Sequence, residues 1–172
     1  MIFNLNGTID RDAVSAVISV LNSLDVTENG IEDLTIYLQS NGGSTGCSNA
    51  IANILNNHKG KLEVIAYESI LSSGFTLFFK LKCKKSILSE TSGMYHLSVV
   101  DGNPIYEGGK LDSYGEFCLK EMVYNFLDGT NKLVGFTDKE IKDMKNSKDV
   151  WFSEKRLKQM LTFNKKYLKN AS

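Results

Sequence analysis

Hydrophobic and polar positions along the 172-residue chain follow two different periods. Short apolar runs of the kind that form strands occur at residues 2–5, 34–38 and 62–67, with shorter candidates at 86–88 and 94–100. Elsewhere apolar residues recur every three or four positions, which predicts helices over 10–24, 44–55, 72–81 and 111–127, and from residues 137 and 153 onward. This alternation predicts an α/β fold with a largely parallel sheet.

Local signals support several of these boundaries. Asp10, Ser44 and Ser153 stand where a helix N-cap is expected, and Thr137 with Glu140 forms a capping-box pattern. The pair Asn6-Gly7 is typical of a turn and predicts the end of the first strand. No repeat or low-complexity linker divides the chain, so residues 1–172 are expected to form a single domain.

Composition narrows the class of protein. Hydrophobic residues make up 42% of the chain, and 20 basic residues balance 20 acidic ones, so no net charge favours nucleic acid as a partner. No apolar run approaches the roughly 20 residues of a membrane-spanning helix, and the first residues do not resemble a secretion signal. We therefore expect neither a nucleic-acid partner nor a membrane partner.

Cysteine and histidine usage indicates the compartment. The three cysteines, Cys47, Cys83 and Cys118, are odd in number and widely spaced, which favours free thiols over a disulfide framework or a zinc site. With only two histidines, His58 and His96, a histidine-rich metal centre is not expected. These observations predict a cytoplasmic protein without a metal or cofactor, in which His58, next to Lys59-Gly60, lies at the surface.

Three segments whose residues could take part in catalysis or binding fall at the ends of predicted strands, where α/β folds place their sites. Residues 40–43 end in two glycines whose amides can face a ligand, although the same pair also suits a tight turn. In 72–74, a serine begins a helix, either as a nucleophile favoured by the helix dipole or as a plain N-cap. In 94–96, His96 is either a general base or a structural histidine.

Taken together, these segments resemble the Clp protease family. Residues 36–43 are similar to the family's strand ending in Asn-Ser-Pro-Gly-Gly, with Asn41 in place of proline. Residues 71–74 occupy the place of the family's Ala-Ser-Met-Gly, and 94–98 that of its Met-Ile-His-Gln-Pro. The resemblance covers residues 2–100 and continues more loosely to Ser153. It implies the ClpP/crotonase-like fold, with repeated ββα units and a protruding handle helix.

The resemblance also implies roles for individual residues. Ser72 would be the nucleophile and His96 the base, with Asp143 or Asp149 as the third member of the triad and Asp143 slightly preferred. Backbone amides of Gly42 and Ser73 would bind the oxyanion. The implied protein is a serine endopeptidase acting on a peptide or protein substrate inside a homo-oligomeric ring, a heptamer or stacked heptamers.

Departures from the family pattern leave alternatives open. The spacing that gives the family's aspartate falls here on Lys145, and Glu68 replaces a glycine near the substrate position. The sequence begins at the first strand, without the segment that forms the family's axial loops, so an ATPase partner is not expected. The two alternatives to a peptidase are an inactive ring subunit with a structural or regulatory role and an acyl-CoA enzyme of the related crotonase type.

Overall fold

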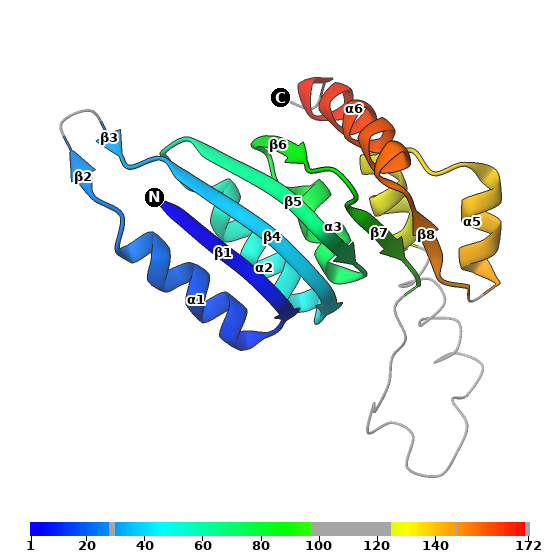
Figure 1. Cartoon of the computed structure of the whole chain (residues 1–172), viewed down its shortest axis with the longest axis horizontal. Coiled ribbons are helices and arrows are strands. Elements are labelled where there is room, and N and C mark those ends of the chain that lie inside the picture. Colours follow the sequence, from blue (N-terminus) through cyan, green and yellow to red (C-terminus); the bar gives the residue numbers. More distant parts are fainter. Residues whose placement is uncertain (28–29, 98–124, 147, 171–172) are drawn as a thin grey trace, which may run out of the picture.

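A mainly parallel six-stranded sheet forms the centre of the computed structural model, which describes residues 1–27, 30–97, 125–146 and 148–170. The strand order is β1-β4-β5-β7-β8, with β6 also paired to β5 (Figure 1). The strands are β1 (Ile2–Ile9), β4 (Leu34–Gly43), β5 (Leu62–Leu71), β6 (Lys84–Ile87), β7 (Ser92–Tyr95) and β8 (Val150–Phe152). Only β8 runs antiparallel to its neighbour, so the predicted α/β fold with a largely parallel sheet is confirmed.

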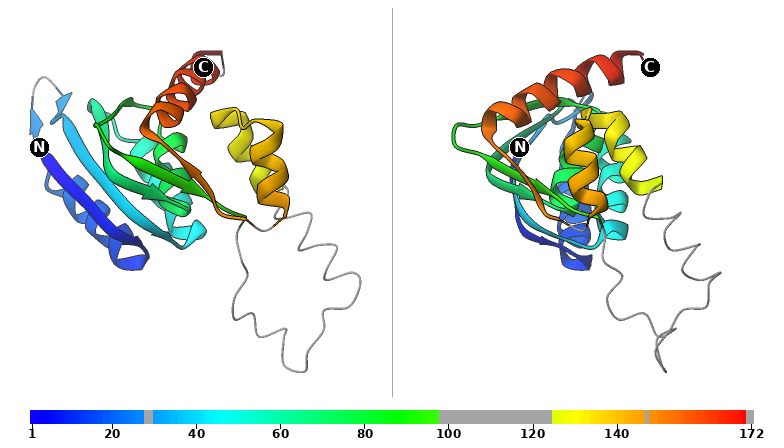
Figure 2. Two further views of the ribbon diagram at one scale, coloured as in Figure 1. Left: turned by 45° about the vertical axis from the view of Figure 1, so that its right-hand side comes forward. Right: turned by 90° about the vertical axis from the view of Figure 1, so that its right-hand side faces the viewer.

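Helices connect and cover these strands. Helices α2 and α3 lie side by side behind the sheet in the view of Figure 1, and α6 packs against β6, β7 and β8. Figure 2 shows α5 and the helical residues 125–134 beside the β8 end of the sheet. The named helices are α1 (Arg11–Asn22), α2 (Thr45–Asn56), α3 (Ser73–Lys80), α5 (Asp138–Lys145) and α6 (Glu154–Asn170), and a short pair, β2 (Val26–Thr27) and β3 (Gly30–Ile31), lies outside the main sheet.

The predicted helix starts are confirmed by their hydrogen bonds. The Asp10 carboxylate accepts from the Ala13 amide at 2.9 Å, and Ser44 Oγ accepts from the Cys47 amide at 3.3 Å. Thr137 and Glu140 form the reciprocal capping box at the start of α5. These side chains satisfy amides that have no partner within the helix, which fixes where each helix begins.

An aromatic cluster joins α3 to the far edge of the sheet. Phe75 of α3 is fully buried and packs against Phe152 of β8, Tyr95 of β7 and Phe136, with ring centroids 5.4–6.2 Å apart. Burial of such rings is among the strongest contributions to a core. The cluster therefore holds the start of α3 in a fixed position relative to the β7–β8 pair.

Two turn predictions are wrong. The first strand does not end at Asn6-Gly7 but continues to Ile9, with a bulge between Gly7 and Thr8 that Gly7 permits by its φ of +91°. Likewise Gly42 and Gly43 do not form a turn after β4 but pair with Thr8 and Ile9 as its last residues. In both places the pairing of β1 with β4 outweighs the local preference of the glycines.

Other predictions are adjusted or lie outside the described residues. The helix predicted over 10–24 ends at Asn22. Of the strand predicted over 94–100, residues 98–100 lie outside the described residues, and the strand that is described runs from Ser92 to Tyr95. Of the helix predicted over 111–127, only 125–127 are described, and they are helical. The turn-rich segment 101–109 and Cys118 lie outside the described residues. No helix in the described part of the chain is long and apolar enough to span a membrane.

Candidate active site

Ser72 occupies a sharp turn between β5 and α3. Its backbone has φ 51° and ψ −115°, a conformation that a residue with a side chain adopts only when its surroundings enforce it. The Ser72 amide donates to the Met94 carbonyl at 2.8 Å, which ties the turn to β7. The Ser72 side chain makes no capping hydrogen bond to α3. The interpretation of Ser72 as a plain N-cap is therefore wrong, and its hydroxyl is available for another partner.

That partner is His96. Ser72 Oγ lies 2.8 Å from His96 Nε2, and the His96 side chain is one-third exposed. His96 directly follows β7, the strand that holds the Ser72 amide, so the two side chains are brought together by the β5–β7 pairing. When Nδ1 carries the ring proton, Nε2 can accept the hydroxyl proton of Ser72.

A carboxylate stands behind the histidine, and it belongs to Asp149. Its Oδ1 lies 3.2 Å from His96 Nδ1, and the Asp149 side chain is 54% exposed. Asp143, which was slightly preferred from the sequence, lies in α5, where its carboxylate accepts from Lys148 Nζ at 2.9 Å. That hydrogen bond lowers the pKa of Asp143. The structure thus brings Asp149 to His96 and leaves Asp143 with Lys148.

The backbone amides expected around the oxyanion are placed differently from the prediction. Gly42 lies close to Ser72, since a Cβ built on Gly42 would be 2.8 Å from Ser72 Cβ, but its amide donates to Ser40 Oγ at 3.0 Å. The Ser44 amide faces β1, where it donates to the Ile9 carbonyl at 2.7 Å. The Gly42 and Ser44 amides thus both turn toward β1, and from this we infer that the Gly43 amide between them faces the β5 side, where Ser72 lies. The alternation along the strand was the signal that sequence reasoning missed.

The Ser73 residue, whose amide was also expected to bind the oxyanion, begins α3 immediately after Ser72. At a helix N-terminus such an amide has no partner within the helix and carries part of the positive end of the helix dipole. The Ser73 side chain is 4% exposed, and its Oγ finds no hydrogen-bond partner among the described residues. Its main-chain carbonyl accepts from Ser48 Oγ at 3.0 Å, which ties the first residue of α3 to α2.

The other histidine, the described cysteines and Glu68 make no contact with Ser72, His96 or Asp149 among the hydrogen bonds and ion pairs of the described residues. His58 is not at the surface as predicted, because it is half-buried and its Nε2 is enclosed, without a hydrogen-bond partner in the described part of the chain. Cys47 and Cys83 are free, half-buried thiols, and burial raises the pKa of Cys83 to about 11. Such a thiol is a poor nucleophile. Glu68 is exposed and holds a left-handed backbone with φ 52°.

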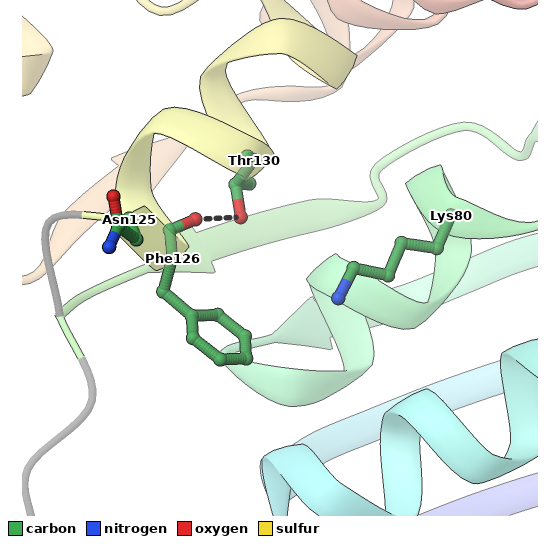
Figure 3. A pocket seen from close by; sticks show the side chains of 5 residues that line it. Lys80, Asn125, Phe126 and Thr130 are labelled. Atoms are coloured by element: carbon green, nitrogen blue, oxygen red, sulfur yellow. Dashed lines mark hydrogen bonds between the residues drawn. The ribbon is translucent and has the colours of Figure 1, made fainter. Parts of the chain in front are cut away.

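A separate pocket of about 250 Å3 lies at the other end of α3 (Figure 3). Lys80 Nζ lies 2.6 Å from Asn49 Oδ1 and 5.2 Å from the centre of the Phe126 ring. Partial burial lowers the pKa of Lys80. The other lining residues are Asn125, Gly129 and Thr130, so none of the residues of the Ser72 site lines this pocket.

Comparisons with known proteins identify the family and the fold. A family model described as Clp protease matches residues 1–101, a range that includes Ser72 and His96 and ends before Asp149. The structure of a ClpP1 mutant from Listeria monocytogenes is similar to the chain with a TM-score of 0.67 and 19% sequence identity, over 92% of this chain and 86% of that chain. No curated protein matches the chain. At this identity the structural likeness shows the fold.

Proposed function

The chain belongs to the Clp protease family, and from that membership and the contact between Ser72 and His96 we propose that it is a serine endopeptidase. The observation that carries the proposal is the 2.8 Å separation of Ser72 Oγ and His96 Nε2, with Asp149 Oδ1 3.2 Å from the other ring nitrogen. A nucleophile, a base and an orienting acid in this order are the arrangement used for acyl transfer.

In the proposed reaction Ser72 Oγ attacks the carbonyl carbon of a peptide bond while His96 Nε2 takes the hydroxyl proton. The tetrahedral intermediate collapses when His96 returns that proton to the leaving amine, which leaves an ester on Ser72. A water molecule then attacks the ester with His96 again as base, and the acid product is released. Asp149 keeps the ring proton on Nδ1 and stabilises the imidazolium that forms in each step.

Charge develops on the substrate oxygen in both steps. We assign its stabilisation to the amides of Ser73, the first residue of α3, and Gly43, in place of Gly42, whose amide is held by Ser40. Each donor of this type typically lowers the barrier by about 3 kcal/mol. The N-terminus of α3 adds a favourable dipole at the same place. No cofactor enters this chemistry.

The assembly and the location are part of the same proposal. Residues 1–172 would act as one domain in a homo-oligomeric ring, a heptamer or stacked heptamers, in which the sites face an enclosed space. The support for a ring is the family membership of the chain. A cytoplasmic location stays a prediction from the cysteine usage. A ring-sized mass in light scattering supports the assembly, and a clean monomer contradicts it.

A fluorophosphonate probe tests the reaction directly, because it reacts with an activated serine without needing the natural substrate. We expect labelling of the wild type at Ser72, shown by peptide mapping, with none in Ser72→Ala and little in His96→Ala. Ser15→Ala, which removes an exposed hydroxyl on α1, is the matched control and should label like the wild type. Folded wild-type protein that stays unlabelled contradicts the proposal.

An inactive ring subunit is the second candidate, and Glu68 is the observation that favours it. The family's glycine near the substrate is replaced by an exposed carboxylate on a left-handed backbone. A charged side chain there opposes the entry of an extended peptide. Absence of labelling in an assembled ring would favour this second function over the first.

A further inference from the structure

Ser40 is a fully buried hydroxyl next to the candidate active site. It lies on β4 with no exposed surface, and its Oγ makes two hydrogen bonds. Ser40 Oγ donates to the Gly7 carbonyl at 2.7 Å and accepts from the Gly42 amide at 3.0 Å. One side chain therefore joins the bulge of β1 to the glycine pair at the end of β4.

The same residue also contacts the helix that begins after Ser72. A Cβ built on Gly74 would lie 2.6 Å from Ser40 Cβ, so α3 reaches this position only with glycine at 74. On its other side, Gly42 approaches Ser72 closely enough that an added Cβ would lie 2.8 Å from Ser72 Cβ. Ser40 thus sits where β1, the glycine pair and the start of α3 meet.

The backbone of Gly42 and Gly43 needs a contact of this kind to hold one conformation. Gly42 has φ 98° and Gly43 has φ 140°, and glycine in these regions moves among many backbone conformations unless its surroundings hold it. The bond from the Gly42 amide to Ser40 Oγ keeps that amide turned toward β1. The following amide, that of Gly43, then faces the opposite edge of β4, where Ser72 lies.

We propose that Ser40 is a positioning residue that fixes the Gly42–Gly43 backbone so that the Gly43 amide faces the oxyanion formed at Ser72. This inference rests on the proposed peptidase function. Ser40 itself does not contact the substrate. It acts through the orientation of a backbone donor, whose alignment matters in the transition state more than in the bound substrate.

The experiment measures kcat and KM of Ser40→Ala on a fluorogenic dipeptide amide that the wild type cleaves, together with inhibition by the aldehyde of the same dipeptide. The aldehyde forms a tetrahedral adduct with a serine nucleophile and so reports on the oxyanion donors. We expect kcat to fall roughly 10- to 100-fold with KM within twofold. The inhibition constant of the aldehyde should rise by the same factor as kcat/KM falls.

A control separates this role from a general loss of stability. Thr91 is buried to a similar degree, and its Oγ1 donates to the Leu88 carbonyl at 2.8 Å. Thr91→Val removes that hydroxyl and should lower the melting temperature while leaving kcat and aldehyde inhibition unchanged. If Ser40→Ala does not fold, Ser40→Cys keeps a side chain of the same shape, slightly larger, that is both a weaker donor and a weaker acceptor, and a three- to tenfold fall in kcat is expected, on the order of one weakened hydrogen bond.

The outcomes are distinct. An active wild type whose Ser40 variants change only in melting temperature, or change in KM with kcat unaltered, overturns the positioning role and leaves the peptidase function standing. A folded wild type that neither cleaves the amide, nor binds the aldehyde, nor reacts with the fluorophosphonate overturns the proposed function and this inference with it. A parallel loss in kcat/KM and aldehyde affinity supports both.

Discussion

His96 Nδ1 lies 3.2 Å from Asp149 Oδ1 because the two residues extend the antiparallel pair β7–β8 by one position, past Tyr95 opposite Val150. The contact is thus set by strand register and not by the helix that carries Asp143. Phe152 of β8 packs on Phe75 of α3, so the core that fixes the nucleophile helix also fixes the strand that presents the acid. Nucleophile, base and acid therefore rest on one connected aromatic core.

The first prediction separates the two aspartates. Asp149→Asn should lower kcat by about 10²- to 10³-fold, because the amide cannot stabilise an imidazolium and favours the wrong ring tautomer. The effect should be smaller than for a fully enclosed triad, since the Asp149 side chain is 54% exposed. Steady-state hydrolysis of a fluorogenic peptide measures it.

Asp143→Asn is the matched control. It breaks the solvent-exposed pair with Lys148 and should change kcat less than twofold and leave the stability nearly unchanged. Equal losses in the two variants would contradict the assignment of Asp149 as the acid behind His96.

A second prediction concerns Gly42. Ala at this position meets Ser72 Cβ at 2.8 Å and must hold φ at 98°, so both packing and backbone oppose it. Gly42→Ala should abolish fluorophosphonate labelling and lower the free energy of unfolding by about 2 kcal/mol or more. Gly129→Ala is the control, because Gly129 is helical with nothing within 4 Å of the added Cβ. That change should stabilise by up to about 1 kcal/mol in urea unfolding.

The sequence predicted the parts of the site that depend on local pattern. Ser72 falls at a strand-to-helix junction and His96 at a strand end, and both positions follow from periodicity and the family resemblance. Asp149 was only one of two options, because the register between β7 and β8 joins residues 55 to 59 positions apart and leaves no local signal. The Gly42 amide was misassigned for a different reason: the sequence favours a turn at Gly42-Gly43, where the alternation of amides along a strand would not apply, but both glycines belong to β4.

A third prediction tests the backbone of Glu68. With φ 52°, Glu68 holds a backbone conformation that glycine adopts freely but that raises the free energy of the folded state for a residue with a side chain. Glu68→Gly should raise the free energy of unfolding by about 0.5 to 1 kcal/mol, after the greater entropy of glycine in the unfolded chain is offset. Glu68→Gln keeps the strain but removes the charge and should leave stability unchanged. A rise in peptide cleavage in both variants would show that the carboxylate hinders substrate binding. A gain in the stability of Glu68→Gln would contradict the explanation from backbone strain.

The last prediction concerns Lys85, which is 3% exposed beneath α3 and α6. Its Nζ donates to the Leu81 carbonyl at 2.7 Å and to Asn164 Oδ1 at 2.5 Å, near the end of α3, and no carboxylate among the described residues pairs with it. Burial lowers the pKa of Lys85 from 10.5 to about 8. A buried ammonium with only neutral partners is thus less favoured than one in water.

The pH dependence of stability follows from this shift. Between pH 8 and 10.5 the unfolded chain holds the Lys85 proton while the folded chain has released it, so the free energy of unfolding rises with pH. The rise should be about 2 kcal/mol between pH 8 and 10 and should be absent below pH 7, where Lys85 is protonated in both states. Urea unfolding at several pH values measures it.

Lys85→Met removes the titrating group and should therefore lose this rise relative to the wild type. Lys84→Met is the matched control, because Lys84 is exposed and paired with Glu63, and it should keep the wild-type slope. The Cys83 thiol, with its pKa raised to about 11, opposes the trend above pH 9, so Cys83→Ala is introduced into all three proteins. Identical slopes with and without Lys85 would mean that its ammonium is solvated in the folded protein, and that α3 and α6 do not enclose it.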